Sequence, residues 1–454
     1  MTITITPAKL TGTVTPPPSK SQAHRLLIAA ALAHGESVIS NVAFSQDIEA
    51  TLRCLEELGA AFEYVGRDDP ARRSQTRNTS QVSGGAGERT AGRVVPPYAH
   101  GGETLRVHGM GANTMSPMRR MAYPRLDCGE SGSTLRFLIP IALAVRGGGI
   151  FTGRGRLMER PLTPYFDIFD EKGISYELKD GVLTVAGLLE PGVYRLPGNV
   201  SSQFFTGLLF ALPLLNGPSA LIPTTQLESE GYIQMTLQAM GRFGVEMPAA
   251  MSLPPQYHPG GNQTYTAANA AVEADWSQAG FWYAAKFLGN NVEITGLNPD
   301  SAQGDAVIDV QYEEMGLSLA PAGSLELDVS GCPDLVPPLA VMAALRAGET
   351  THLENAGRLR MKESDRLASV TAVLNALGAD VVEGPDSLTI RGKERLRGGV
   401  TVDSHNDHRI AMMAAIAATR CEKPVTIAGA ECVCKSYPDF WEEYERLGGK
   451  VERV

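Results

Sequence analysis

The chain has 454 residues, of which 43% are hydrophobic and 20% charged, and its formal net charge is −10 at pH 7. This length exceeds the size at which one hydrophobic core keeps growing, so we expect two domains. The acidic balance argues against nucleic acid as the main partner, because phosphate backbones attract a basic face. No apolar run approaches the roughly 18 residues of a membrane span, and the N-terminus lacks a signal or transit pattern, so we expect a cytoplasmic protein without a membrane partner.

Six similar units follow one another along the chain. Each contains an apolar helix with a polar head, an amphipathic helix that ends at a glycine, and strand-like runs, one of them directly after the glycine. The six helix-ending glycines are Gly59, Gly173, Gly244, Gly316, Gly378 and Gly448. A helix that is apolar on nearly every face must be buried, so each unit is expected to supply one buried helix.

The first unit is the longest because of a stretch at 66–102 that is rich in Gly, Arg, Ser and Pro and has no apolar period. We interpret it as a mobile surface insertion, with an acidic ligand for its arginines as the alternative. A loop-like stretch at 255–272 divides the units three and three. The first domain is therefore predicted at 19–265. Residues 1–18 and 266–454 form the second, because the N-terminal strand is expected to pair with the C-terminal half.

Basic and hydroxyl-bearing residues gather at the polar heads of the first three apolar helices, where backbone N–H groups can bind an anion. The residues in question are Lys20, Ser21 and Arg25 in the first head, Gly132 and Arg136 in the second, and Ser201, Ser202 and Gln203 in the third. Ordinary helix capping is the alternative for each head. The cations at the first head lie at the positive end of a helix dipole, which disfavours them unless an anion binds there.

The densest cluster of charges lies at 357–366, ahead of an apolar helix face. Lys362 and Arg366 are four residues apart and would repel each other, while Glu363 lies between them. Further basic residues in short motifs are Arg156, Arg160, Arg409 and Lys435. So many cations predict a ligand with several negative charges, and the carboxylates predict proton transfer.

The six cysteines lack the spacing of metal ligands, and only Cys432 and Cys434 lie close together in the sequence. With no histidine or second cysteine pair beside them, we expect buried thiols and no metal site.

Seven motifs occur in an order and at intervals that resemble those of the 5-enolpyruvylshikimate-3-phosphate (EPSP) synthase family. They are "PSKSQAHR", "GESGSTLR", "RLMERPLTP", "SSQFFTGLL", "MKESDRL", "NDHRIAMM" and "CKSYPDFW". The resemblance runs from end to end apart from the insertion. It implies a two-domain inside-out α/β barrel with three βαβαββ units per domain, helices buried and sheets outside.

The resemblance also implies an activity on the way to chorismate and the aromatic amino acids. The enolpyruvyl group of phosphoenolpyruvate is transferred to the 5-hydroxyl of shikimate 3-phosphate by addition and elimination, and phosphate is released. A monomer would do this without a metal or organic cofactor, closing over its two small-molecule substrates. The family binds the herbicide glyphosate in its phosphoenolpyruvate site.

Matching the motifs residue by residue implies roles within the site. Asp334 is the expected base at the 5-hydroxyl, Glu363 the expected proton donor and acceptor at C3, and Lys20 a partner in proton transfer. Residues expected to bind shikimate 3-phosphate are Lys20, Ser21, Arg25, Ser201, Ser202, Gln203, Ser229, Tyr232, Asp334 and Lys362. Residues expected to bind phosphoenolpyruvate are Lys20, Gly132, Arg160, Gln203, Arg366, Arg409 and Lys435.

Glu130, Phe137 and Arg358 depart from residues common in the family and leave glyphosate sensitivity open. Glu130 places a carboxylate beside the expected phosphoenolpyruvate site unless it points away or pairs with a cation. Two other functions are the alternatives. A UDP-N-acetylglucosamine enolpyruvyl transferase typically has a loop cysteine, which has no match here. A non-catalytic scaffold that binds phosphorylated metabolites would be expected to have lost residues such as Asp334 or Glu363.

Overall fold

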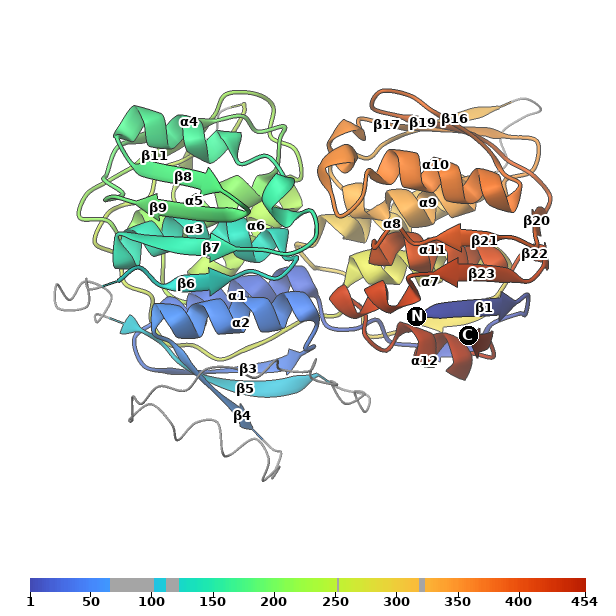
Figure 1. Cartoon of the computed structure of the whole chain (residues 1–454), viewed down its shortest axis with the longest axis horizontal. Coiled ribbons are helices and arrows are strands. Elements are labelled where there is room, and N and C mark those ends of the chain that lie inside the picture. The colour runs from blue at the N-terminus through green and yellow to red at the C-terminus, as the bar shows by residue number, and fades with distance from the viewer. Residues whose placement is uncertain (66–101, 112–121, 251–252, 318–322) are drawn as a thin grey trace.

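The computed structural model describes residues 1–65, 102–111, 122–250, 253–317 and 323–454 (Figure 1). The predicted insertion at 66–102 therefore lies, apart from Gly102, outside the described residues. Two lobes lie side by side, each around its own hydrophobic core. One core is built from residues between Ala23 and Val272, and the other from residues 3–14 and 276–447. The chain thus passes from one core to the other twice. The exact domain boundaries at 18/19 and 265/266 stay a prediction.

The first lobe contains six α-helices among the residues described. They are α1 (Lys20–Leu32), α2 (Gln46–Leu58), α3 (Gly132–Arg146), α4 (Thr163–Lys172), α5 (Ser202–Ala211) and α6 (Glu230–Arg242). Its strands are β3 (Glu36–Val42), β4 (Ala61–Val65), β5 (Glu103–His108), β6 (Arg125–Asp127), β7 (Gly148–Thr152), β8 (Ser175–Lys179), β9 (Val182–Ala186), β10 (Val193–Leu196), β11 (Ala220–Pro223), β12 (Ala249–Ala250), β13 (Gln256–Tyr257) and β14 (Ala270–Ala271). Short 3₁₀ helices are η3 (Leu157–Glu159) and η4 (Leu212–Leu214).

The second lobe repeats this plan. Its helices are α7 (Trp276–Phe287), α8 (Ile308–Gly316), α9 (Val336–Ala344), α10 (Arg366–Leu377), α11 (His408–Ala418) and α12 (Phe440–Arg446). Its strands are β1 (Thr2–Thr6), β2 (Thr11–Val14), β15 (Asn291–Ile294), β16 (Ser324–Asp328), β17 (Thr350–Glu354), β18 (Asp380–Glu383), β19 (Leu388–Arg391), β20 (Leu396–Gly398), β21 (Thr401–Asp403), β22 (Cys421–Lys423), β23 (Val425–Ala428) and β24 (Lys450–Arg453). Its 3₁₀ helices are η5 (Gly304–Val307), η6 (Pro333–Leu335), η7 (Gly357–Met361) and η8 (Ala430–Lys435).

The four-stranded sheets share one pattern of strand directions. The four-stranded sheets are β14-β3-β5-β4, β6-β7-β9-β8, β10-β11-β13-β12, β16-β17-β19-β18 and β21-β23-β1-β24. In each, the first two strands are parallel and the remaining neighbours are antiparallel. The smaller sheets β15-β2 and β20-β22 belong to the second lobe. This repeated pattern of strand directions is the structural counterpart of the repeated sequence pattern.

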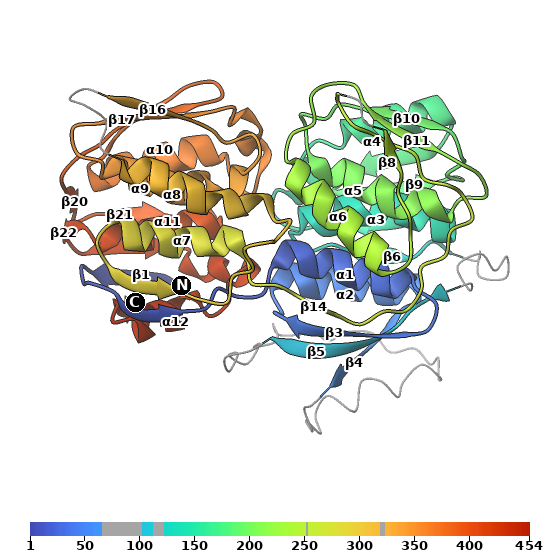
Figure 2. The same ribbon diagram turned by 180° about the vertical axis from the view of Figure 1, so that it is seen from behind.

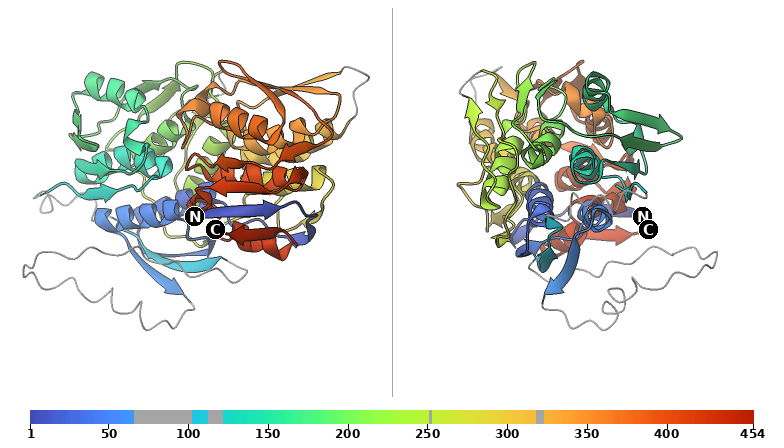
Figure 3. Two further views of the ribbon diagram at one scale, coloured as in Figure 1. Left: turned by 45° about the vertical axis from the view of Figure 1, so that its right-hand side comes forward. Right: turned by 90° about the vertical axis from the view of Figure 1, so that its left-hand side faces the viewer.

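The N-terminal strand belongs to the second lobe. β1 pairs with β23, with Ile3 opposite Ile427, and with β24, with Ile3 opposite Arg453. The two ends of the chain therefore lie close together (Figure 3).

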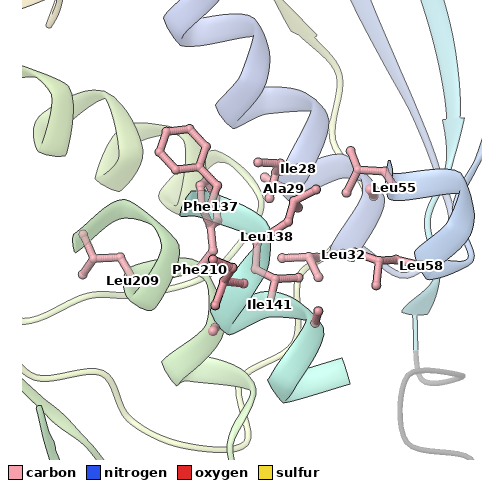
Figure 4. Close-up of a cluster of buried hydrophobic side chains, with 14 of the residues drawn as sticks. Ile28, Ala29, Leu32, Leu55, Leu58, Phe137, Leu138, Ile141, Leu209 and Phe210 are labelled. Carbon is pink, nitrogen blue, oxygen red and sulfur yellow. The ribbon is translucent and has the colours of Figure 1, made fainter. Parts of the chain in front are cut away.

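The helices predicted to be buried are α1, α3, α5, α7, α9 and α11, and most of their residues are buried. They lie in the interior of the lobes, while the sheets lie on the outside (Figures 1 and 2). Figure 4 shows Leu32 of α1, Leu138 of α3 and Phe210 of α5 in the core of the first lobe. This is the inside-out arrangement that the resemblance implied. Among the helices that the structure describes, none has both the length and the apolar character to cross a bilayer.

Glycine caps end several amphipathic helices, as predicted. Gly59, Gly173 and Gly378 are the C-caps of α2, α4 and α10, each with the positive φ that glycine adopts without strain. Gly316 is different, because it is the last residue of α8 and the cap, Leu317, is extended, so this end requires no left-handed residue.

The strand expected directly after Gly244 is absent from the described part of the third unit, where the next strand, β12, begins at Ala249. The backbone N–H of Val245 donates to the carbonyl of Met240, and that of Glu246 to the side chain of Gln263. These N–H groups are satisfied without a sheet partner. Five of the six cysteines are buried, and the sixth, Cys434, is half-buried.

Candidate active site

A polar cleft between the lobes is lined by the first turns of helices from both of them. Ser19, Ser131, Ser201, Asp365 and Asp407 cap α1, α3, α5, α10 and α11, each accepting a hydrogen bond from a backbone N–H of the first turn. Capping and ligand binding are therefore not alternatives at these heads. The capping residue satisfies one or more N–H groups, and the side chains that follow it face the cleft.

All predicted site residues except Lys435 line this cleft: Lys20, Ser21, Arg25, Gly132, Arg160, Ser201, Ser202, Gln203, Ser229, Tyr232, Asp334, Lys362, Glu363, Arg366 and Arg409. Asp47, Arg136, Phe137, Arg358 and His408 line it as well. The predicted roles of these residues stay predictions at this point, since proximity does not assign a function.

The cation at the first helix head has its counter-charge in other elements. The ammonium of Lys20 donates to Asp47 Oδ2 at 2.8 Å, and its backbone N–H donates to Asp275 Oδ2 at 3.1 Å. Burial favours the neutral form of Lys20, but the charges of Asp47 and Glu363, together with the hydrogen bond to Asp47, outweigh it and raise the pKa of Lys20. Sequence reasoning missed Asp47, because nothing local marks the first turn of α2 as part of a site.

Arg25 is a buried cation for which the described residues provide no ion pair. Its Nε donates to Thr236 Oγ1 at 2.8 Å, and one terminal nitrogen donates to the carbonyl of Ser21 at 2.7 Å. The guanidinium lies 5.2 Å from the centre of the Phe137 ring and 5.8 Å from that of Tyr232. Burial lowers the pKa of Arg25 to about 10, so it stays charged at neutral pH and can bind an anion. Phe137, one of the departures from the family pattern, packs against this cation.

Gln203 is oriented by two neighbours. Its side-chain oxygen accepts a hydrogen bond from Arg136 at 2.7 Å, and its nitrogen donates to Ser133 Oγ at 3.0 Å. The α3 backbone comes close at this point: a Cβ on Gly132 would lie 2.9 Å from a terminal nitrogen of Arg160. Only glycine at this position leaves Arg160 where it is.

Arg366 holds three carboxylates at once. It is 1% exposed, and its nitrogens lie 2.8 Å from Asp334 Oδ1, 2.7 Å from Glu363 Oε2 and 2.8 Å from Asp407 Oδ2. One guanidinium therefore fixes the relative positions of Asp334 and Glu363. Its five N–H donors in a rigid plane suit it to this role, which lysine could not fill.

The two candidate catalytic carboxylates are held in their ionised form. Burial alone would raise the pKa of Asp334, but Arg409, Lys362 and Arg366 hold it well below its usual range. Arg409 lies 3.1 Å and Lys362 3.4 Å from its oxygens. Burial is also outweighed at Glu363, where Arg160 and Arg366 keep the pKa well below its usual range.

The two lobes also contact each other around Arg358. Its guanidinium lies 3.2 Å from Glu228 and donates to Ser229 Oγ at 2.6 Å. Ser229 has the positive φ of 56°, which is uncommon for a residue other than glycine. The backbones of α6 and η5 touch nearby, since a Cβ on Gly231 would lie 2.7 Å from Gly304. Arg358, a departure from the family pattern, thus links the lobes beside the cleft.

Glu130 pairs with a cation, one of the two possibilities left open by the sequence. Its Oε2 lies 2.6 Å from the ammonium of Lys435 and accepts a hydrogen bond from Asn406 at 3.1 Å. Lys435 is 5% exposed and also donates to the carbonyl of Asn406 at 2.7 Å. The pair crosses from the first lobe to the second. Lys435 therefore lies beside the cleft with its charge already paired.

No group of three or more His, Cys, Asp or Glu side chains within the described ranges is arranged to hold a metal ion. The chemistry that the cleft residues offer is that of anion binding by arginine, lysine and helix N-termini, together with proton transfer by two carboxylates.

Comparison with known proteins agrees with this cleft chemistry. The family model described as EPSP synthase (3-phosphoshikimate 1-carboxyvinyltransferase) matches residues 5–95 and 89–444. A 3-phosphoshikimate 1-carboxyvinyltransferase of Clostridium kluyveri is 42% identical over 99% of this chain and 98% of its own length. One of Clostridium beijerinckii is 43% identical over 98% of this chain and 97% of its own length.

Solved structures share the fold. An EPSP synthase from Acinetobacter baumannii superposes with a TM-score of 0.72 at 23% identity, covering 100% of both chains. The enolpyruvyl transferase NikO from Streptomyces tendae superposes with a TM-score of 0.73 at 16% identity, covering 100% of this chain and 98% of its own. With the family model and the full-length relatives, the chain belongs to the EPSP synthase (3-phosphoshikimate 1-carboxyvinyltransferase) family.

Proposed function

We propose how the cleft residues divide the work of the reaction that this family catalyses. The chain transfers the enolpyruvyl group of phosphoenolpyruvate to the 5-hydroxyl of shikimate 3-phosphate and releases phosphate. The observation that carries the proposal is the Arg366 cluster, in which one terminal nitrogen of the guanidinium contacts Asp334 and the other contacts Glu363. Two carboxylates fixed in this way can serve the two proton transfers that the addition step requires.

Asp334 accepts the proton of the 5-hydroxyl as its oxygen attacks C2 of phosphoenolpyruvate. Its lowered pKa supports this role, because the base is ionised before the reaction begins. Glu363 exchanges the proton at C3, with Lys20 as its partner. The lowered pKa of Glu363 in the ligand-free cleft opposes proton donation. Two bound substrates, each with a phosphate and a carboxylate, offset the field of the surrounding cations and raise the pKa of Glu363 into the range that an acid needs.

The substrates divide between two sets of cations. Shikimate 3-phosphate binds Lys20, Ser21, Arg25, Ser201, Ser202, Gln203, Ser229, Tyr232, Asp334 and Lys362, and phosphoenolpyruvate binds Lys20, Gly132, Arg160, Gln203, Arg366, Arg409 and Lys435. Arg25 is buried and has no ion pair among the described residues, which supports its assignment to an anionic group. Because both sets draw on both lobes, the lobes close over the substrates. The enzyme acts as a cytoplasmic monomer without a cofactor.

Phosphate release from phosphoenolpyruvate by the purified protein tests the reaction. We expect release with shikimate 3-phosphate as acceptor and none with UDP-N-acetylglucosamine. Asp334→Asn and Glu363→Gln, which keep the shape of each side chain, should each lose at least about a hundredfold in kcat. If phosphate is released with UDP-N-acetylglucosamine and not with shikimate 3-phosphate, the protein is a UDP-N-acetylglucosamine enolpyruvyl transferase. If neither acceptor supports release, the protein is a binding scaffold. Full activity of either variant would contradict the role assigned to that carboxylate.

A further inference from the structure

The buried carboxyl group of Asp305 is connected to Asp334 through the hydroxyl of Tyr232. Asp305 belongs to η5 and is 3% exposed. Its Oδ2 accepts a hydrogen bond of 2.7 Å from the hydroxyl of Tyr232, and its Oδ1 is buried without a hydrogen-bond partner in the described part of the chain. The ion pairs found among the described residues include none with Asp305. A buried carboxylate without a cation is costly, so its surroundings favour the protonated form.

The Tyr232 hydroxyl lies between two carboxyl groups. It is 2.7 Å from Asp305 Oδ2 and 3.4 Å from Asp334 Oδ2. One hydroxyl carries one proton and can donate to only one of these oxygens at a time. When Asp305 is protonated, it can donate to the tyrosine oxygen, and the tyrosine can then donate to Asp334. When Asp305 is ionised, the direction reverses. The three groups form an unbroken path for a proton.

The charged surroundings give the two carboxyl groups different pKa values. Asp334 is ionised because Arg409, Lys362 and Arg366 outweigh its burial. At Asp305, burial and the charge of Asp334 raise the pKa to about 7, against the opposing charge of Arg409.

The remaining titratable groups that face Asp305 come from other elements. Asp275, at the start of α7, raises its pKa further, and the Tyr232 hydroxyl of α6 favours the ionised form by donating to it. Cys332 lies close as a thiol, because burial raises its pKa to about 12. Burial and the charges of Asp305 and Asp334 likewise keep Tyr232 protonated. Paired carboxyls whose surroundings separate their pKa values can act as donor and acceptor.

We propose that Asp305 is a positioning residue at the far end of a proton relay that runs from Asp334 through Tyr232. This inference rests on the proposed function, in which Asp334 takes the proton of the 5-hydroxyl. As the O–H bond breaks and the O–C2 bond forms, the proton moves to Asp334. Asp334 passes it to the oxygen of Tyr232, whose own proton moves to Asp305. Asp334 is again a carboxylate, Asp305 is neutral, and the proton leaves for solvent by the reverse route once the product has gone.

The relay crosses from one lobe to the other. Tyr232 belongs to α6 of the first lobe, whereas Asp305 and Asp334 belong to the second. The close approach of Gly231 and Gly304 brings the hydroxyl within reach of both carboxyls. The path is therefore complete only when the lobes are in contact, so that proton removal from the substrate is tied to closure of the cleft.

Asp305→Asn tests the proposal, because asparagine keeps the shape of the side chain and cannot accept the proton. In the wild type, Asp305 must be ionised to accept, so kcat should fall as the pH drops through about 7. We expect Asp305→Asn to lower kcat at pH 8 by about tenfold, a smaller loss than that of a residue in direct contact with substrate, and to abolish the fall near pH 7. Asp309→Asn is the matched control, since Asp309 accepts a hydrogen bond of 2.9 Å from Tyr283 at the surface and should leave kcat and its pH profile unchanged.

Two further measurements separate the outcomes. The infrared difference between wild type and Asp305→Asn should contain a protonated carboxyl band that disappears near pH 7, a signal that does not depend on turnover. Tyr232→Phe removes the hydroxyl that bridges the two carboxyl groups, and it should also abolish the fall of kcat near pH 7. This variant tests the relay even if Asp305→Asn does not fold. A wild-type profile in Asp305→Asn or in Tyr232→Phe, or a difference spectrum without that band, would overturn the relay alone. Absence of phosphate release in wild type with shikimate 3-phosphate would instead overturn the proposed function on which the relay rests.

Discussion

Neutralising Glu130 should strengthen the binding of phosphoenolpyruvate. The carboxylate of Glu130 lies 2.6 Å from the ammonium of Lys435, a residue that we assign to phosphoenolpyruvate. Like this substrate, the carboxylate is negatively charged. Glu130→Gln keeps an acceptor for the ammonium and for Asn406 but removes the charge. Lys435 then has its full charge available for the ligand.

The size of the effect follows from the distances. An anion that contacts the far side of the Lys435 ammonium at about 2.8 Å would lie about 5 Å from the Glu130 carboxylate. Two unit charges 5 Å apart repel each other by about 0.8 kcal/mol at the dielectric constant of water and by about 3 kcal/mol at an effective value of 20. The side chain of Glu130 is 30% exposed, which places it between these limits. We therefore expect the KM for phosphoenolpyruvate to fall by about fivefold to a hundredfold, since each 1.4 kcal/mol corresponds to about a factor of ten.

Phosphate release with varied phosphoenolpyruvate at saturating shikimate 3-phosphate measures this KM. Glu159→Gln is the control, because Glu159 lies on the same lobe, is 74% exposed and should leave the KM unchanged. A KM that rises in Glu130→Gln would refute the reasoning. It would mean that the carboxylate holds Lys435 in the orientation that substrate requires, and that its repulsion of the substrate is minor.

Three further predictions concern stability, each measured by urea denaturation. Gly207→Ala places a methyl carbon 2.5 Å from the hydroxyl of Tyr165, where α5 packs on α3, and should lower the free energy of unfolding by about 1–3 kcal/mol, whereas Gly241→Ala, with no atom within 4 Å, should not lower it. Arg366→Ala leaves the buried carboxylate of Asp407 and the partly buried ones of Asp334 and Glu363 without their shared cation and should cost about 3–5 kcal/mol; a loss under 1 kcal/mol would contradict the central role of this residue. Burial and nearby cations hold the pKa of His24 well below its usual range, so the stability it contributes is complete above about pH 6.5 and is lost as the pH falls toward its folded pKa. Between pH 6.5 and 5, wild type should therefore lose up to about 1.4 kcal/mol per pH unit more than His24→Gln, and parallel curves would show that His24 is not buried in its neutral form.

Most of the fold could be read from local patterns. An apolar helix with a capped polar head, such as α1 with Ser19 before Lys20, has the same signature wherever it occurs, because capping and burial depend on residues within a few positions. The glycine that ends α2 is equally local. The pattern misled at Gly316, where the helix ends without a left-handed residue, since a glycine permits that conformation but does not require it.

The candidate site divides in the same way. Its cations and hydroxyls occupy helix heads or short motifs, so the sequence by itself marked them as candidates. The carboxylates that set their charge state had no such signal. Asp47 meets Lys20 from the next helix, Glu130 meets Lys435 from 305 positions away, and Asp305 meets Tyr232 across the lobes.

Only the tertiary structure decided these pairings, because they depend on how the buried helices pack and how the two lobes meet. An ion pair is specified by the positions of two atoms to within an ångström or so, whereas a sequence pattern specifies which face of a helix is buried. The sequence determined the six units, their buried helices and the polar heads of those helices. The packing of the two lobes determined which charges in the cleft are already paired. It also left Arg25 buried at the cleft without an ion pair among the described residues.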